Sequence, residues 1–163
     1  MTHWDDIVRE HGPMVFGTAW RILGHVADTE DVVQEVFLEI HRRSQTVAVR
    51  SWPGLLRRLA ACRALDRLRQ RKSIVSLNGL ALAGRNGTPE SAAMEHEFAD
   101  RLRQSIAELP QRESAVFCLR YFEDLSYQEI AETLSISPGA VATALHKART
   151  KLEALRTELV KGA

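Results

Sequence analysis

The chain has 163 residues, of which 45% are hydrophobic and 26% are charged, and its formal net charge is +1. This composition supports one mid-sized domain or two small ones and excludes a globally disordered chain. No apolar run approaches the length of a bilayer span, and the first residues lack the apolar stretch of a signal peptide. We therefore expect a cytoplasmic protein without membrane insertion.

Apolar residues recur at helical spacing almost throughout, without strand-like alternation. The first predicted helix covers Asp5–Leu23, with Pro13 inside it and Gly24 as its stop. The second runs from Asp28, its predicted N-cap, to about Arg43. Its expected buried stripe consists of Val33, Val36, Phe37 and Ile40.

The other side of the second helix is acidic and polar. Carboxylates in its first turn suit the helix dipole. The residues of this side are Asp28, Glu30, Asp31, Gln34, Glu35 and Leu38. A solvated helix is the favoured interpretation of this pattern by itself, although an acidic face with one exposed leucine also fits a protein-docking surface.

A third helix is predicted over Trp52–Arg71, with Pro53 in its first turn. Residues 47–75 contain 8 basic residues and 1 acidic residue, a local excess typical of a segment that contacts a polyanion. Trp52 suits either stacking on an unpaired base or a core position. The predicted apolar side holds Leu55, Leu59, Cys62 and either Leu65 or Asp66. The basic side chains are Arg57, Arg58, Arg63, Arg67, Arg69, Arg71 and Lys72.

Residues 73–88 contain three glycines and two asparagines without a clear period, which predicts a linker. It separates an N-terminal domain, residues 1–72, from a C-terminal domain, residues 89–163. Pro89 opens a predicted fourth helix that ends near Leu109, and Pro110 begins a fifth that ends near Phe122.

Residues 126–152 contain the most informative local pattern. Ser126 and Glu129 have the spacing of a capping box, and Ser137 followed by Pro138 starts a second helix. The inward stripe of that helix is Val141, Leu145, Ala148 and Leu152. This is the pattern of a helix-turn-helix, whose second helix can enter a DNA major groove, and also of an ordinary helical hairpin.

The predicted fold class is therefore all-α: two small helical domains joined by a linker, the C-terminal one a four-helix unit that contains a helix-turn-helix. Cys62 and Cys118 lie in helical patterns without a CxxC pair, so we expect buried free thiols. The six histidines are scattered, and no nucleophile–base pair, metal-ligand cluster or phosphate loop is visible. We expect no enzyme, no metal and no cofactor.

Four segments, taken together and in this order, resemble the extracytoplasmic-function group of bacterial RNA polymerase sigma factors. They are DTEDVVQEVFL at 28–38, RALDRLR at 63–69, LPQRESAVF at 109–117 and LSYQEIAE at 125–132. The resemblance covers nearly the whole chain. It implies that residues 1–72 are sigma region 2 and residues 89–163 are sigma region 4.

The resemblance also implies partners and contacts. The partners are the polymerase core, through the β′ clamp helices and the β subunit, promoter DNA and, as is frequent in this group, an anti-sigma factor. The acidic side of the second helix would dock on the core. The −10 contacts would come from Trp52 and the seven basic residues of the third helix. The −35 contacts would be Ser126, Tyr127, Ser137, Pro138, Gly139, Thr143, His146, Lys147 and Arg149.

The sequence departs from the family pattern at several positions. Cys62 stands where an asparagine is common, and Pro53-Gly54 replaces larger apolar residues. Ala142 and Ala144 stand where a lysine and an arginine are frequent in the recognition helix, which leaves few side chains for bidentate base contacts.

Two other hypotheses remain beside promoter-specific initiation. One is a stand-alone helix-turn-helix regulator, which has no need of the acidic and basic helices. The other is a sigma mimic that does not initiate transcription, which the alanine-rich recognition helix keeps open.

Overall fold

The computed structural model describes residues 3–46, 48–78 and 90–161. These residues form seven helices, and no strand occurs among them, which confirms the all-α prediction. The helices are α1 (Trp4–Leu23), α2 (Val26–Ser44), α3 (Trp52–Asn78), α4 (Glu90–Glu108), α5 (Gln111–Tyr121), α6 (Tyr127–Leu134) and α7 (Pro138–Lys161).

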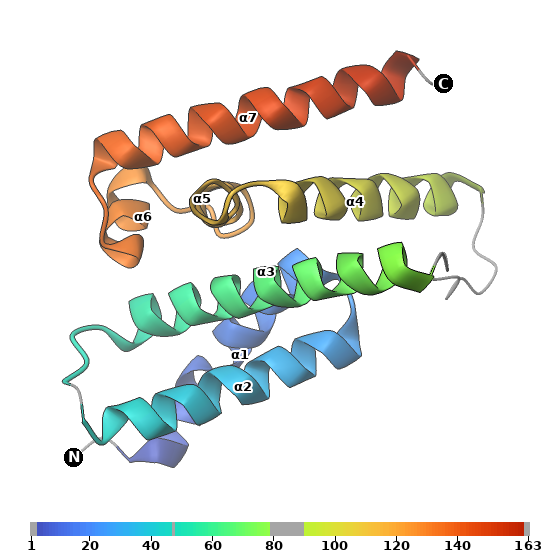
Figure 1. Cartoon of the computed structure of the whole chain (residues 1–163). Coiled ribbons are helices and arrows are strands. Elements are labelled where there is room, and N and C mark those ends of the chain that lie inside the picture. The colour runs from blue at the N-terminus through green and yellow to red at the C-terminus, as the bar shows by residue number, and fades with distance from the viewer. Residues whose placement is uncertain (1–2, 47, 79–89, 162–163) are drawn as a thin grey trace.

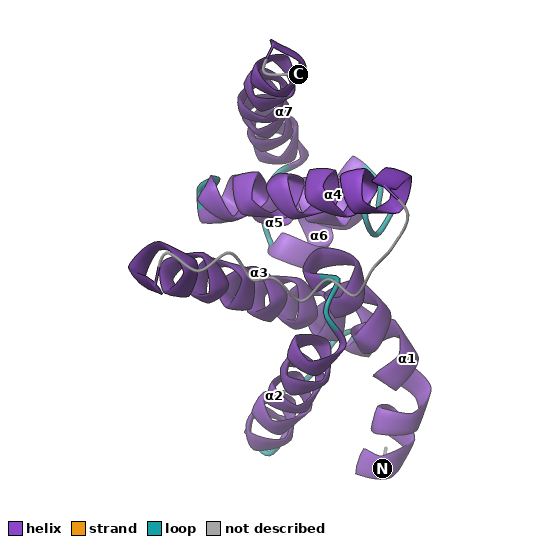
Figure 2. Cartoon of the chain, turned by 90° about the vertical axis from the view of Figure 1, so that its right-hand side faces the viewer, coloured by secondary structure: helices purple, strands orange, loops and turns teal. Residues whose placement is uncertain are grey.

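Helix α3 is the central element of the molecule. Helices α1 and α2 pack on one side of it, and α4, α5 and α6 pack on the other (Figures 1 and 2). Helix α7 forms the outer layer over α4–α6. The two predicted domains are therefore in direct contact, with α3 shared between them.

The burial pattern of α3 differs from the prediction of a single apolar side. Leu55, Leu59 and Cys62 are only partly buried, and Asp66 is too. Because the helix is covered on two sides, its fully buried residues lie on both, and half of them are alanines, which permit close helix packing. They are Leu56, Ala60, Ala61, Ala64, Leu65 and Leu68.

Helix α2 begins earlier than the sequence predicts. Its N-cap is His25, whose Nδ1 accepts a hydrogen bond from the Asp28 amide at 3.3 Å, so Asp28 lies in the first turn and is not the cap. Val32 is fully buried, whereas the predicted core residue Val33 is only partly so. Val36, Phe37 and Ile40 are buried as predicted.

The helix ends follow local chemistry where the sequence carries a clear signal. Gly24 ends α1 in the left-handed region at φ 60°, and its N–H donates to the Trp20 carbonyl. Pro13 lies inside α1 without ending it. Two predicted ends are wrong: α3 continues into the predicted linker as far as Asn78, and α7 continues beyond Leu152 to Lys161. The rest of the predicted linker, 79–88, lies outside the described residues.

Candidate functional site

The outer side of α2 is the first candidate surface. Glu30, Gln34 and Glu35 are exposed, and Leu38 has 56% of its surface exposed. The α2 residues Leu38 and Glu35 also line a hollow of about 470 Å³ that continues toward Arg63 of α3. An exposed leucine among carboxylates, beside a hollow, has the chemistry of a protein-docking surface.

An ionic ladder joins this acidic helix to the basic helix α3. Carboxylates on successive turns of α2 meet arginines on successive turns of α3, because the helices are antiparallel and each residue set recurs at steps of three or four. The pairs are Asp28 with Arg71, Asp31 and Glu35 with Arg67, and Glu39 with Arg63. Acids of α2 that were predicted to bind the polymerase core therefore contact arginines of α3 that were predicted to bind DNA.

The geometry of the ladder differs from rung to rung. Arg67 Nη2 lies 2.8 Å from Glu35 Oε1 but 3.8 Å from Asp31 Oδ2. Arg63 Nη2 lies 2.6 Å from Glu39 Oε2, and this hydrogen bond raises the pKa of Arg63. The Arg67–Glu35 pair is the most open to water of the short rungs, and an exposed pair contributes about 0–1 kcal/mol, so a stronger partner can displace it.

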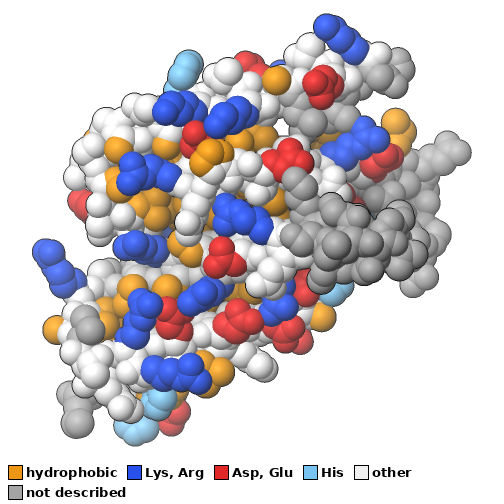
Figure 3. Space-filling model, in the orientation of Figure 1, with side chains coloured by type: hydrophobic (Ala, Val, Ile, Leu, Met, Phe, Trp, Pro, Cys, Tyr) orange, Lys and Arg blue, Asp and Glu red, His pale blue; other side chains and the backbone are white. Residues whose placement is uncertain are grey.

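Two further arginines of α3 face the C-terminal domain. Arg69 Nη2 donates to Ser114 Oγ of α5 at 2.8 Å. Arg57 Nε lies 3.6 Å from Glu123 Oε2, just beyond the end of α5. The described part of α3 thus does not present a uniform basic face, and in Figure 3 Lys and Arg side chains are interspersed with Asp and Glu side chains.

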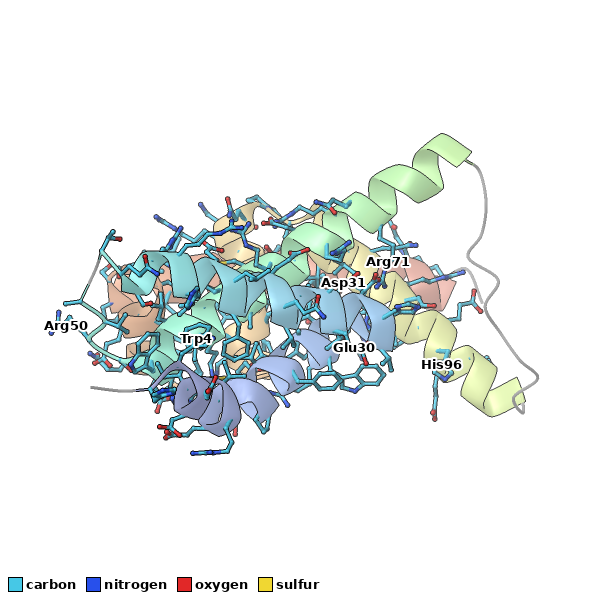
Figure 4. The ribbon with its side chains drawn as sticks, turned by 90° about the horizontal axis from the view of Figure 1, so that it is seen from below. Trp4, Glu30, Asp31, Arg50, Arg71 and His96 are labelled. Atoms are coloured by element: carbon cyan, nitrogen blue, oxygen red, sulfur yellow. The ribbon has the colours of Figure 1, made fainter. Side chains whose placement is uncertain are left out.

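The first turns of α3 and the loop before it hold the remaining basic groups. Arg58 is exposed, as is Arg50, which the sequence analysis did not select. Both line a groove of about 510 Å³ between this loop and α6. Figure 4 shows Arg50 at one end of the α2–α3 pair and Asp31 and Arg71 at the other. Arg50 lies in the basic segment 47–75, and that position was the sequence signal that could have identified it. The Lys72 side chain lies outside the described residues.

Trp52 resolves one open alternative. It opens α3 and packs, partly buried, against the hydrophobic core. This favours the core interpretation, although part of the ring stays accessible. Cys62, at the position of a common asparagine, is also partly buried, and burial raises the pKa of its thiol.

The helix-turn-helix forms as the sequence predicts. Ser126 Oγ accepts from the Glu129 amide at 3.1 Å, and Glu129 Oε2 accepts from the Ser126 amide at 2.8 Å, which completes the capping box. Ser137 Oγ accepts from the Ala140 amide at the start of α7. Ser135 makes the turn between the helices in the left-handed conformation, at φ 56°.

All nine predicted −35 residues are exposed on α6, α7 or the turn. Their side chains are unequally available, since Arg149 Nε donates to the Tyr121 hydroxyl and its guanidinium lies over that ring. Lys147 and His146 are exposed. One interpretation is corrected: Ala144 is 5% exposed and belongs to the core, so only Ala142 stands on the exposed side in place of a long basic residue.

The chain matches two models of sigma-70 domains. Residues 7–74 match sigma-70 region 2, and residues 99–152 match sigma-70 region 4. The region 2 match contains all of α2 and most of α1 and α3. The region 4 match contains the end of α4, all of α5 and α6 and the first part of α7.

Curated relatives give the same result over the length of the chain. The ECF RNA polymerase sigma factor SigW of Bacillus subtilis is 31% identical over 94% of this chain and 87% of its own length. The RNA polymerase sigma factor CarQ of Myxococcus xanthus is 31% identical over 96% and 90%. SigE of Mycolicibacterium smegmatis is 30% identical over 93% of this chain, which spans 61% of that longer protein.

Solved structures share the fold at lower identity. CnrH in complex with the cytosolic domain of CnrY superposes with a TM-score of 0.60 at 21% identity, covering 95% of this chain and 88% of CnrH. The sigma factor RpoE of Bartonella quintana, in complex with the anti-sigma factor NepR, gives 0.54 at 14% identity, covering 92% and 94%. Among the described helices of the present chain, none is both long and apolar enough to cross a membrane.

Proposed function

Because this chain belongs to the extracytoplasmic-function group of RNA polymerase sigma factors, which bind the polymerase core and direct promoter-specific transcription initiation, we propose how its surfaces divide these tasks. Residues 1–72 act as region 2 and residues 89–163 as region 4, with residues 73–88 between them. We also propose that the chain acts in the cytoplasm, where the polymerase is, and that RNA synthesis is catalysed by the polymerase and not by this chain.

The outer side of α2 docks on the polymerase core, at the β′ clamp helices. The supporting observation is the exposed Leu38 among Glu30, Gln34 and Glu35. A desolvated leucine supplies apolar burial, and surrounding carboxylates steer a basic partner. Of these acids, Glu30 is the best probe, because Glu35 also pairs with Arg67 and its loss would disturb the ladder.

The start of α3 and the preceding loop contact the −10 element. Arg50, Arg57 and Arg58 supply phosphate contacts at one end of the helix, with the accessible part of Trp52 next to them. Arg63, Arg67 and Arg71 hold the ladder in the free chain, and they add phosphate contacts when polymerase engages the acids of α2. The exposed side of α7 contacts the −35 element, with Lys147 as a phosphate contact and Thr143 near thymine methyl groups.

The core-docking proposal is tested by two substitutions on the outer side of α2, one that reverses a charge and one that removes the exposed leucine side chain. We expect Glu30→Lys and Leu38→Ala each to weaken binding of the full chain to purified polymerase core by about tenfold, because interface-centre side chains contribute 1 kcal/mol or more. Glu10→Lys, which reverses an exposed acid of α1, is the matched control and should bind as the wild type does. Binding unchanged in both α2 variants, with wild-type circular dichroism, would place the docking surface elsewhere.

Run-off transcription decides between initiation and a mimic. We expect the chain with core polymerase to produce transcripts from promoter fragments recovered by sequencing the DNA that the holoenzyme binds. Core binding without an open complex on any recovered fragment would instead identify a sigma mimic.

A further inference from the structure

We propose that Glu123 is an intramolecular latch, which holds the two domains closed and keeps Arg57 from DNA until the polymerase core separates them. Glu123 lies just past the C-terminal end of α5, whereas the hydrogen-bond and ion-pair partners of its carboxylate among the described residues belong to the N-terminal domain. The inference rests on the proposed −10 role of the start of α3, but the closed state itself can be tested without polymerase or DNA.

The carboxylate of Glu123 is almost completely withdrawn from solvent, with 4% of its side chain exposed. Arg21 of α1 donates to it in a fork, with Nε 3.0 Å from Oε1 and Nη2 2.9 Å from Oε2. Thr18 Oγ1, also of α1, donates to Oε2 at 3.0 Å. A bidentate arginine–carboxylate pair in such a buried place is stronger than one in water, and removing one partner leaves a poorly compensated charge.

Arg57 is the third partner and the weakest. Its Nε lies 3.6 Å from Glu123 Oε2, which is an ion-pair distance but too long for a hydrogen bond. That Nε is buried and has no hydrogen-bond partner among the described residues. A buried unsatisfied donor raises the free energy of the closed state, so Arg57 gains a hydrogen bond if it exchanges the carboxylate for a DNA phosphate.

Two other polar contacts cross the same interface. Arg69 donates to Ser114 of α5, and Arg103 Nε of α4 donates to the Ile22 carbonyl at the end of α1, at 3.1 Å. Burial lowers the pKa of Arg103, which records the cost of withdrawing its charge from water. The domains are thus joined partly by charged groups that lose solvation in the closed state, and this loss opposes closure.

The closed state also places acidic residues opposite basic ones across a groove. Arg50 and Arg58 line one side, and Glu129 and Glu132 of α6 line the other. Helix α6 packs on α3 directly, so the helix-turn-helix is held against the −10 surface. Two promoter elements cannot be bound separately while these surfaces contact each other, so the domains must part for the proposed function.

The closed state is tested on the full chain by small-angle X-ray scattering. Glu123→Gln keeps the shape of the side chain and removes its charge, and Arg21→Ala removes the principal donor from the other domain. We expect both variants to raise the open-to-closed ratio about tenfold and to increase the radius of gyration. Glu97→Gln is the matched control, because Glu97 is exposed and pairs only one turn away, with Arg101 of the same helix.

Each outcome of this experiment bears on the latch. An increase in both variants but not in Glu97→Gln supports it. Wild-type scattering from both, with wild-type helix content, overturns it. If Glu123→Gln loses helix content, Arg21→Ala decides alone, since the Arg21 side chain is 44% exposed and its removal substitutes no residue of the C-terminal domain.

The masking of Arg57 is tested by DNA binding without polymerase. The probe is a fluorescein-labelled single-stranded DNA oligonucleotide. We expect the affinity of Glu123→Gln for this probe to exceed that of the wild type by the same factor as its open-to-closed ratio does. Equal binding by an opened variant overturns the masking of Arg57. Failure of the wild-type holoenzyme to initiate transcription would overturn the proposed function and leave the scattering result intact.

Discussion

At the scale of single residues, short-range hydrogen bonds determine where helices begin, and burial determines which side chains are shielded from reaction. Ser126 and Glu129 each satisfy a backbone amide of the other, at a helix of only 8 residues whose ends form a large part of its length. Cys118 is fully buried in α5, so its thiol contributes to packing and not to reactivity.

Replacing the cap residue should destabilise the C-terminal domain. We expect Ser126→Ala to lower the free energy of unfolding by about 1 kcal/mol, since the Glu129 amide loses its acceptor. Urea unfolding followed by circular dichroism measures the change. Ser105→Ala is the control, because the Ser105 hydroxyl only donates to the Arg101 carbonyl within α4. A loss as large in the control as in Ser126→Ala would show that the cap has no special role.

The Cys118 thiol should make stability depend on pH at the alkaline end. Burial raises its pKa above the ordinary value of 9.0, so the folded state holds the proton more tightly than the unfolded chain does. The stabilisation is complete below pH 9 and is lost progressively as the pH rises toward the folded-state pKa. We expect the unfolding free energy to fall with pH more steeply in the wild type than in Cys118→Ala, by up to about 1.4 kcal/mol per pH unit. Parallel curves for the two proteins would contradict this.

At the scale of helices, one element serves more than one purpose. Helix α3 supplies core residues to both domains, a ladder to α2 and the proposed DNA contacts, all in 27 residues. Helix α7 is simpler, because one side is buried through Val141, Ala144 and Leu145 and the opposite side, the proposed DNA-contacting side, is exposed.

The recognition helix should contribute a modest, mainly electrostatic contact. We expect Lys147→Ala to weaken holoenzyme binding to its promoter fragments to a similar extent for different sequences and to reduce the salt slope of binding by about 1. Lys161→Ala makes the same charge change at the far end of α7 and should leave the slope unchanged. A loss confined to one −35 sequence would instead indicate that Lys147 contacts a base.

At the scale of the whole molecule, a single cluster of buried apolar residues extends from α1 to α7. It contains Leu23 and Val36 of the N-terminal domain, Leu65 of the shared α3, and Ile106 and Leu145 of the C-terminal domain. Polar bonds such as that from Arg21 to Glu123 add to this apolar contact between the two halves.

This continuity predicts cooperative unfolding. The three tryptophans, Trp4, Trp20 and Trp52, all report on the N-terminal domain. We expect Ile106→Ala, in α4, to destabilise the chain by about 2–5 kcal/mol and to shift the tryptophan fluorescence transition together with the circular dichroism transition. A fluorescence midpoint that stays at its wild-type value would show that the domains unfold separately.

The sequence by itself determined the features that depend on neighbours along the chain. The number and order of the helices, the Gly24 stop, the capping box at Ser126 and the inward stripe of α7 all follow from local periodicity and backbone hydrogen bonding. Together with the four ordered motifs, they were sufficient to indicate the family.

Only the tertiary structure decided which surfaces are free. Charge composition made α3 look like one basic stripe, yet Arg63, Arg67 and Arg71 pair with acids of α2 and Arg57 lies against Glu123. Periodicity also missed the second buried side of α3 and the burial of Ala144, because one sequence cannot reveal which helices come to lie against a given side. Pairing between charges far apart in the chain depends on the packing of the whole molecule, and here that packing connects the proposed DNA-binding and polymerase-binding surfaces with the contacts between the domains.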